Sequence, residues 1–120
     1  MLILIAHGSR DPSWRRSLEE LAESLQAELG QERLGLAYMQ CSPPTLMDVA
    51  SEAVRRGEGK IRVLPLFLAR QGHVERTVVP LVKQLVEQLR PAHPSVEVEL
   101  LPPIGQHPLF RDLLRRIAKE

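Results

Sequence analysis

The sequence predicts an α/β fold of three layers, in which helices cover both faces of a four-stranded parallel sheet. Strand-like and helix-like segments alternate four times along the 120 residues, and such alternation is typical of parallel sheets with helical crossovers. Two of the strand-like segments are almost continuously apolar, as strands buried on both faces are. The length is that of one ordinary domain, so we expect residues 1–120 to form a single unit.

Four short segments carry the strand signal, namely residues 2–6, 34–40, 61–68 and 96–101. The first and third are the continuous apolar runs and are expected at the centre of the sheet. The fourth alternates valine or leucine with glutamate, a pattern that favours an edge strand.

The first helix has the clearest signals. Asp11 can cap it, Pro12 suits the first helical position, and leucines recur at helical spacing until Gly30 ends it. Three further helices are predicted over about 44–56, from about 80, and over about 108–119. The stretch 69–79 is then a connection of about eleven residues, longer than the usual ~2–6, and long connections of this kind are often functional.

Composition excludes several classes of function. The formal net charge is only +1, with one tryptophan, one tyrosine and two phenylalanines, which argues against a nucleic-acid partner. No apolar run approaches the ~20 residues of a membrane span. The single cysteine, Cys41, cannot form an internal disulfide and is expected to be a small buried residue. These features predict a cytoplasmic protein that binds neither nucleic acid nor membrane.

Three of the four histidines follow predicted strands, at the edge where ligands bind in open parallel sheets. His7 and His73 each lie next to a glycine, which lets another group approach closely. Neutral imidazole binds cobalt, nickel, iron and zinc, and two histidines form an incomplete shell that suits a metal held briefly. His107 is expected to cap the last helix, and His93 lies in a turn on the opposite side.

Arginines surround the start of the first helix, where acidic residues are normally favoured. They are Arg10, Arg15 and Arg16. One interpretation is an anion site, because a helix N-terminus and guanidinium groups both attract anions. The other is a solvated basic turn that Asp11 partly balances.

Four segments together carry a resemblance to a known family: LILIAHGSRDP, AYMQCSPPTLMDV, IRVLPLFLARQGHVERTVVP and PPIGQHPLF. They closely resemble the small class II tetrapyrrole chelatases, the half-length sirohydrochlorin cobaltochelatases and their ferrochelatase relatives. The resemblance covers nearly the full chain in order. Its most specific parts are the His-Gly-Ser-Arg turn and the Pro-Leu-Phe-Leu…Gly-His-Val segment.

This resemblance implies a flavodoxin-like, chelatase-type half, and a homodimer that mimics the two halves of longer chelatases. The implied reaction is insertion of a divalent metal, with cobalt as the first choice and iron or nickel as alternatives, into sirohydrochlorin. Such a lyase serves cobalamin, sirohaem or related tetrapyrrole biosynthesis. The metal is a substrate, and no organic cofactor is implied.

The resemblance also assigns residues. It makes His7 and His73 the metal ligands and catalytic residues, which could also accept the pyrrole protons. The implied contacts to the substrate and its carboxylates are Ser9, Arg10, Arg70, Gly72 and Arg76. The chain departs from the family's pattern at one place: Gln40 and Cys41 stand where an acidic residue is expected near the end of the second strand. This departure leaves open which metal is preferred and whether activity changes.

Two alternatives stay open. A non-catalytic carrier of metal or tetrapyrrole would use nearly the same ligands. A histidine-type phosphatase also places a His-Gly turn after its first strand, but it normally needs an arginine beside the histidine, where this chain has Ala6.

Overall fold

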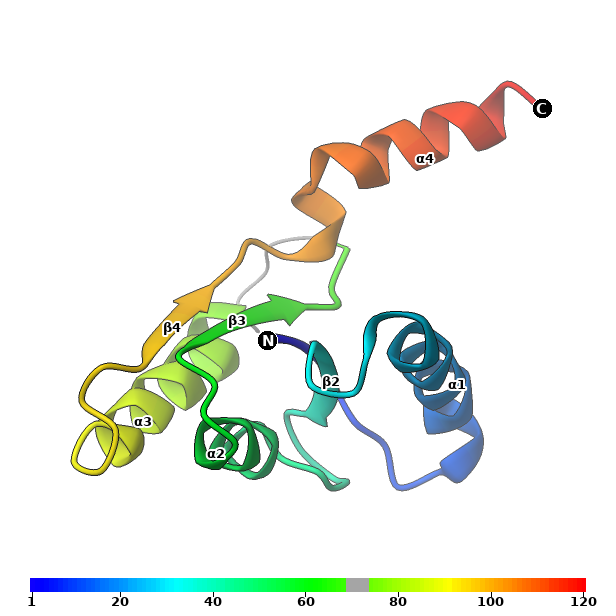
Figure 1. Ribbon diagram of the computed structural model, residues 1–120. Helices are drawn as coiled ribbons and strands as arrows, with labels where there is room; N and C mark the ends of the chain where they lie inside the picture. The colour runs from blue at the N-terminus through cyan, green and yellow to red at the C-terminus, as the bar shows by residue number, and fades with distance from the viewer. Residues whose placement is uncertain (69–73) are drawn as a thin grey trace.

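The computed structural model describes residues 1–68 and 74–120, except for the side chains of Val74 and Glu75. Its strands are β1 (Leu2–Ala6), β2 (Leu34–Tyr38), β3 (Lys60–Pro65) and β4 (Glu97–Leu100). Its α-helices are α1 (Pro12–Leu29), α2 (Leu46–Arg55), α3 (Val79–Leu89) and α4 (Pro108–Ala118). A π-helical turn, η1 (Val74–Val78), precedes α3, and a 3-10 turn, η2 (Ile104–Gln106), precedes α4 (Figure 1).

The four strands form one parallel sheet in the order β2-β1-β3-β4. The two apolar strands β1 and β3 lie at its centre, and the alternating strand β4 lies at an edge, as the sequence predicts. The predicted fold class is therefore confirmed.

Helices cover the two faces of the sheet unequally. On one face, α2 and α3 pack on a core whose members include Ile3, Ile5, Ile61, Val63, Ala50 and Leu85. On the other face, α1 packs through Ala22 on Leu4 and Leu34. Full burial of a leucine or isoleucine side chain contributes roughly 1.5–3 kcal/mol, so the first cluster, which has more fully buried members, contributes more to stability than the second.

Helix α1 begins and ends where the sequence predicts. The Asp11 carboxylate accepts a hydrogen bond from the backbone N–H of Ser13 at 3.0 Å, Pro12 follows as the first helical residue, and Gly30 ends the helix with φ 104°. Two hydrogen bonds then join α1 to β2. The Gln26 side-chain amide donates to the Leu34 carbonyl at 3.0 Å, and the Tyr38 hydroxyl donates to Glu19 at 3.3 Å.

Several boundaries differ from the predicted ones for local reasons. β2 ends at Tyr38 instead of residue 40, and Cys41 then takes φ 67°, a left-handed conformation that no strand accommodates. α2 starts at Leu46, because Thr45 and Asp48 form a reciprocal capping box. The prediction of a loop throughout 69–79 is wrong from Val74 onward, where helical backbone begins. The prediction that Cys41 is buried is also wrong, since its side chain is exposed.

Helix α4 does not cover the sheet. It extends away from the other elements (Figure 1), and the radius of gyration is 14.9 Å, compared with about 13.6 Å for a compact 120-residue domain. Among the described helices, none is long and apolar enough to cross a membrane.

Candidate functional site

His7 directly follows the central strand β1, at the carboxyl edge of the sheet, and is exposed. Its imidazole ring packs on the ring of Phe67, which follows β3; the ring centroids are 4.7 Å apart and the planes are tilted by 48°. The side chain thus points out from the edge where ligands bind in this class of sheet, and one of its faces is in contact with an apolar ring.

The loop after His7 lies tightly against the loop after β2. The Gln40 backbone N–H donates to the His7 carbonyl at 3.3 Å. Gly8 has φ 89°, and a Cβ atom there would collide with the carbonyl oxygen of Gln40. Only glycine combines this conformation with this close approach, so Gly8 fixes where the His7 backbone lies.

Ser9 and Asp11 shape the turn that leads into α1. The Ser9 backbone N–H donates to the Ser42 hydroxyl at 3.4 Å, and the Ser9 hydroxyl accepts from the Asp11 backbone N–H at 3.1 Å. Hydrogen bonds from the Ser13 backbone and hydroxyl lower the pKa of the Asp11 carboxyl, against a small opposing effect of desolvation. The carboxylate is therefore held ionised in a turn that carries Arg10.

A cavity of about 180 Å³ lies beside His7, between α1 and the ends of three strands. It is lined by Ala6, His7, Gly8, Ser9, Trp14, Arg15, Leu18, Tyr38 and Leu66. Two of the predicted site residues, His7 and Ser9, thus share one cavity with an arginine and an aromatic ring.

Arg15 is the functional candidate that the sequence prediction did not assign to the substrate. Its Nε atom is buried and has no hydrogen-bond partner among the described residues, and its Nη1 lies 3.9 Å from a Glu19 carboxylate oxygen. Glu19 also accepts from the Tyr38 hydroxyl, whose pKa is raised by burial and by the charge of Glu19. The signal in the sequence was the helical position of Arg15, on the same side of α1 as the buried Ala22.

The other predicted site residues lie apart from this cavity or outside the described residues. Arg10 and Arg76 are exposed, in the turn before α1 and in η1. The predictions for Arg70, Gly72 and His73 fall outside the described residues. His107 caps α4 as predicted, because its Nδ1 accepts from the Leu109 backbone N–H at 3.1 Å.

The described residues hold no group of three or more histidine, cysteine, aspartate or glutamate side chains around one point. His93 lies in the turn after α3, beside Gly57 and Gly59 at the opposite edge of the sheet. The pairing of His7 with His73 as metal ligands therefore stays a prediction.

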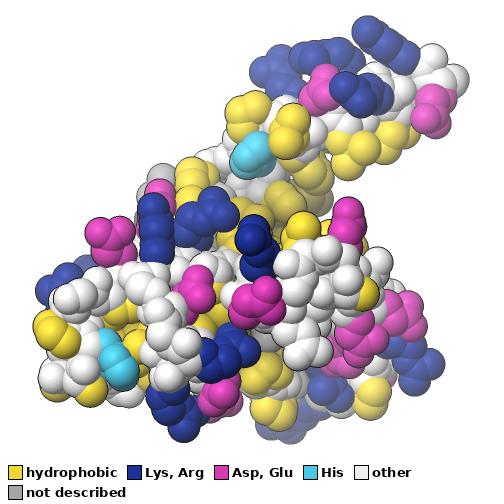
Figure 2. All heavy atoms as spheres, viewed as in Figure 1, with side chains coloured by type: hydrophobic (Ala, Val, Ile, Leu, Met, Phe, Trp, Pro, Cys, Tyr) yellow, Lys and Arg dark blue, Asp and Glu magenta, His cyan; other side chains and the backbone are white. Residues whose placement is uncertain are grey.

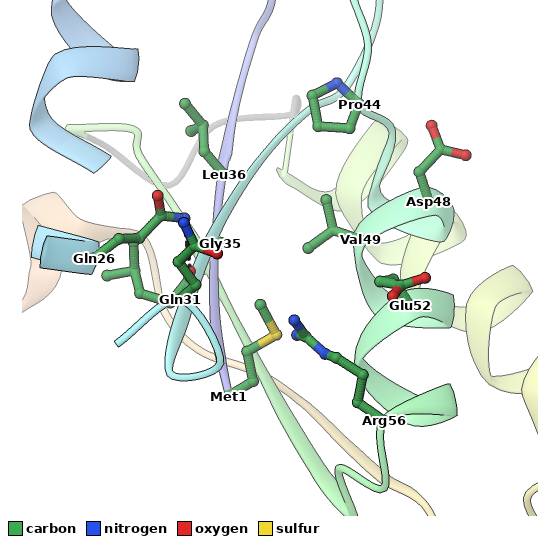
Figure 3. A pocket seen from close by; sticks show the side chains of 11 residues that line it. Met1, Gln26, Gln31, Gly35, Leu36, Pro44, Asp48, Val49, Glu52 and Arg56 are labelled. Atoms are coloured by element: carbon green, nitrogen blue, oxygen red, sulfur yellow. Dashed lines mark hydrogen bonds between the residues drawn. The ribbon is translucent and has the colours of Figure 1, made fainter. Parts of the chain in front are cut away.

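A larger cavity of about 410 Å³ runs along the outer edge of β2 (Figure 3). Figure 3 shows the Arg56 side chain extending toward Met1 across it, with Val49 and Glu52 on α2. None of the described histidines lines this cavity, and its Met1 end lies at the amino edge of the sheet. The position of His7 makes the carboxyl edge the better candidate.

Comparisons with known proteins agree on one family. The family model CbiX matches residues 1–120. The sirohydrochlorin cobaltochelatase of Methanopyrus kandleri is 35% identical over 78 residues, which are 64% of this chain and 54% of the relative. That of Methanococcoides burtonii is 26% identical over 124 residues, covering 99% of this chain and 94% of the relative. The match to the first of these thus spans about half of the relative's length.

Solved structures show the same fold. A CbiX protein from Marinobacter aquaeolei VT8 superposes with a TM-score of 0.81 at 33% identity, covering 99% of this chain and 91% of the other. The sirohydrochlorin chelatase SirB from Bacillus subtilis subspecies spizizenii, solved in complex with cobalt, gives a TM-score of 0.77 at 18% identity. That match covers 98% of this chain and 49% of SirB, and at this identity it shows the fold alone.

Proposed function

The chain belongs to the CbiX family, and from this premise we propose that it inserts a divalent metal ion into sirohydrochlorin. The observation that carries the proposal is the position of His7. It is exposed at the carboxyl end of the central strand, beside a cavity that Arg15 also lines. The proposed metal ligand and the proposed anion-binding residue thus line the same cavity.

In the proposed reaction His7 binds the incoming metal ion through neutral imidazole, and His73 is the proposed second ligand. Two ligands hold the ion without enclosing it, so the four pyrrole nitrogens can replace them. The two pyrrole N–H protons must leave as the metal enters. A histidine that has released the metal is a base of suitable strength to accept one of them. Contact with Phe67 limits the rotation of the His7 ring during this exchange.

The carboxylates of the macrocycle are the proposed partners of the arginines. Arg10 and Arg76 are exposed, so both can reach a ligand in solution. Arg70 is proposed as a third partner of the carboxylates from the family resemblance. Ser9 and Gly72 complete the proposed contacts with the substrate. Arg15 joins this group, because its side chain lines the cavity beside His7. A hydrogen bond to a charged group contributes ~1.5–3 kcal/mol, so two or three such contacts would orient the ring.

Cobalt is the proposed metal, with cobalamin biosynthesis as the pathway. The names of the curated relatives support cobalt, whereas SirB structures contain cobalt or Fe³⁺. Gln40 and Cys41 are exposed at the same edge of the sheet, so a thiol is available near the site. The proposed compartment is a reducing cytoplasm, in which this exposed thiol would stay reduced.

A homodimer is proposed as the active form. The cavity beside His7 measures about 180 Å³, less than the ~300–1,000 Å³ of typical small-molecule sites. The chain matches about half of SirB. Two copies with facing carboxyl edges would supply the larger cleft that a macrocycle needs.

The test is metal insertion by the purified protein. Sirohydrochlorin and Co²⁺ are mixed with and without protein, and the change in the absorption spectrum of the macrocycle is followed. The proposal expects insertion above the spontaneous rate, with many turnovers for each copy. A carrier would instead give a single stoichiometric burst, and an unchanged rate would contradict both.

A further inference from the structure

Trp14 holds its indole ring in solvent near the start of α1. It is the single tryptophan of the chain, and at 75% it is the most exposed large hydrophobic side chain among the described residues. Figure 2 shows that hydrophobic side chains are also exposed elsewhere, among charged side chains of both signs. Exposure alone therefore gives the ring no function, since single exposed hydrophobic residues are common. Its position does.

The ring lies at the mouth of the cavity beside His7. Of the nine described residues that line this cavity, two are exposed, His7 and Trp14. The other seven are buried or half-buried, so they form the floor and the walls. A ligand that approaches from solution therefore meets the imidazole and the indole rings first.

The cavity is apolar next to the indole ring. Leu18 lies one turn after Trp14 on α1, and Leu66 follows β3; both line the cavity and both are half-buried. Leu66 also packs against the core cluster under α1. The lining includes the polar side chains of Ser9 and Arg15 as well. A ligand at the mouth thus meets both an apolar surface and groups that bind carboxylates.

The start of α1 fixes the backbone of Trp14. Its N–H donates to the Asp11 carbonyl at 3.1 Å, and the Asp11 carboxylate accepts from the Ser13 N–H at 3.0 Å. A tryptophan side chain has only two torsions to order, so placing its large ring against a ligand costs little conformational entropy. The indole ring is therefore a well-anchored apolar surface beside His7.

The size of the cavity decides how a macrocycle can bind. Its volume of about 180 Å³ is smaller than the ~300–1,000 Å³ of typical small-molecule sites. A flat tetrapyrrole must therefore lie across the mouth, over the two exposed rings. We propose that the indole ring of Trp14 stacks under the edge of this macrocycle while His7 faces its centre, an inference that rests on the function proposed above.

The two rings make different contacts in this arrangement. The metal ion passes from His7 to the pyrrole nitrogens, so the imidazole must face the centre of the macrocycle. Stacking needs only the flat surface of one pyrrole ring at the periphery, in the offset geometry that aromatic pairs prefer. Trp14 thus sets the lateral position of the macrocycle over His7. Since stacking is the same before and after insertion, losing it should raise KM without lowering kcat.

Binding of metal-free sirohydrochlorin, followed by its absorption spectrum, tests the contact apart from catalysis. Trp14→Ala should weaken the affinity by about five- to hundredfold, the range for a nucleic-acid base stacked on an aromatic side chain. Trp14→Leu keeps an apolar side chain without a flat ring and should bind nearly as weakly. Trp14→Phe keeps a smaller ring and should recover part of the affinity. Equal affinities of the wild type and Trp14→Ala would overturn the proposal.

Leu21→Ala is the matched control. Leu21 is 50% exposed on α1, two turns after Trp14, and does not line the cavity. This variant should bind sirohydrochlorin as the wild type does. An equal loss of affinity in Leu21→Ala and Trp14→Ala would show that the loss is not specific to the indole ring. Both side chains are exposed, so both variants should fold, which circular dichroism checks.

The indole N–H signal provides a readout that needs no variant. A ¹⁵N-labelled chain has one such signal, because it has one tryptophan. The ring current of a macrocycle stacked on Trp14 should move this signal to higher field when sirohydrochlorin is added. No shift at saturation, or a shift to lower field, would contradict stacking.

Failure of this contact and failure of the proposed function give different results. If the wild type inserts cobalt and Trp14→Ala binds the macrocycle equally well, only the contact is overturned. If the indole signal and the variants respond as expected but no metal is inserted, the contact stands and the function fails. A wild type that binds no sirohydrochlorin overturns both. A Trp14→Leu variant that loses self-association in sedimentation velocity, yet keeps its affinity, would instead assign the ring to a contact between copies.

Discussion

The rings of His7 and Phe67 pack together with their centroids 4.7 Å apart. The two residues follow β1 and β3, the paired central strands of the sheet. The proposed metal ligand, His7, is thereby held by a neighbouring side chain that cannot itself bind a metal ion.

Phe67→Leu tests this contact. The leucine keeps apolar bulk but loses the aromatic pair, which contributes ~0.5–1.5 kcal/mol. We expect metal insertion to slow by about two- to tenfold, with a small change in melting temperature. Phe110→Leu, on α4, is the control and should leave the rate of each dimer unchanged. Equal rates of metal insertion for the wild type and Phe67→Leu would show that the Phe67 ring has no part in the reaction.

Arg15→Gln tests the proposed anion contact. Losing a charged hydrogen bond should weaken the apparent affinity for sirohydrochlorin by about ten- to hundredfold, because glutamine cannot neutralise a carboxylate. Arg16→Gln, the exposed neighbour, should change the affinity less than twofold. The Michaelis constants of the two variants for sirohydrochlorin, measured at low salt, decide between an anion site and a solvated basic turn. Similar values would favour the solvated basic turn.

Asp11 predicts a pH dependence of stability. Its folded-state pKa is lowered from 3.8 by the hydrogen bonds from Ser13. Its contribution to stability is therefore fully present above the ordinary value and is lost as the pH falls through the lowered folded value. Asp11→Asn caps the helix without titrating. Melting curves across this acidic range should show a steeper loss of stability in the wild type than in Asp11→Asn. Parallel pH profiles would contradict this role.

Gly8 and Gly57 form a matched pair. Both have positive φ, 89° and 98°, but a Cβ on Gly8 meets the Gln40 carbonyl oxygen whereas one on Gly57 meets nothing within 4 Å. Each change to alanine should destabilise through the backbone by about 1 kcal/mol or more. Gly8→Ala should lower the free energy of unfolding, measured with denaturant, clearly more than Gly57→Ala does. Gly8→Ala should also slow metal insertion, because it displaces His7. Equal losses would show that the close approach is unimportant.

The sequence predicts the strands, α1 and the three-layer class because these depend on local patterns. Continuous apolar runs place β1 and β3 at the centre, and Asp11-Pro12 places the start of α1. The end of β2 and the exposure of Cys41 depend on how the loop of Gln40 packs against Gly8, a contact between distant segments that no local pattern reports.

The same distinction applies to the site. The sequence predicts His7 as a site residue because it directly follows a buried strand. The position of Arg15 in the cavity depends on Tyr38 and Glu19, which the fold brings together. The apolar leucines of α4 predict a helix, but only the structure shows that this helix leaves its own sheet uncovered.

The proposed transfer of a metal ion by His7 into the macrocycle can be tested by comparing Co²⁺ insertion into sirohydrochlorin by the wild type, His7→Ala and His93→Ala. We expect His7→Ala to lose nearly all insertion above the spontaneous rate with only a small change in melting temperature, because His7 is exposed and outside the core. His93→Ala, at the opposite edge of the sheet, should insert cobalt at the wild-type rate. Wild-type insertion by His7→Ala, or an equal loss in both variants, would show that His7 does not transfer the metal ion.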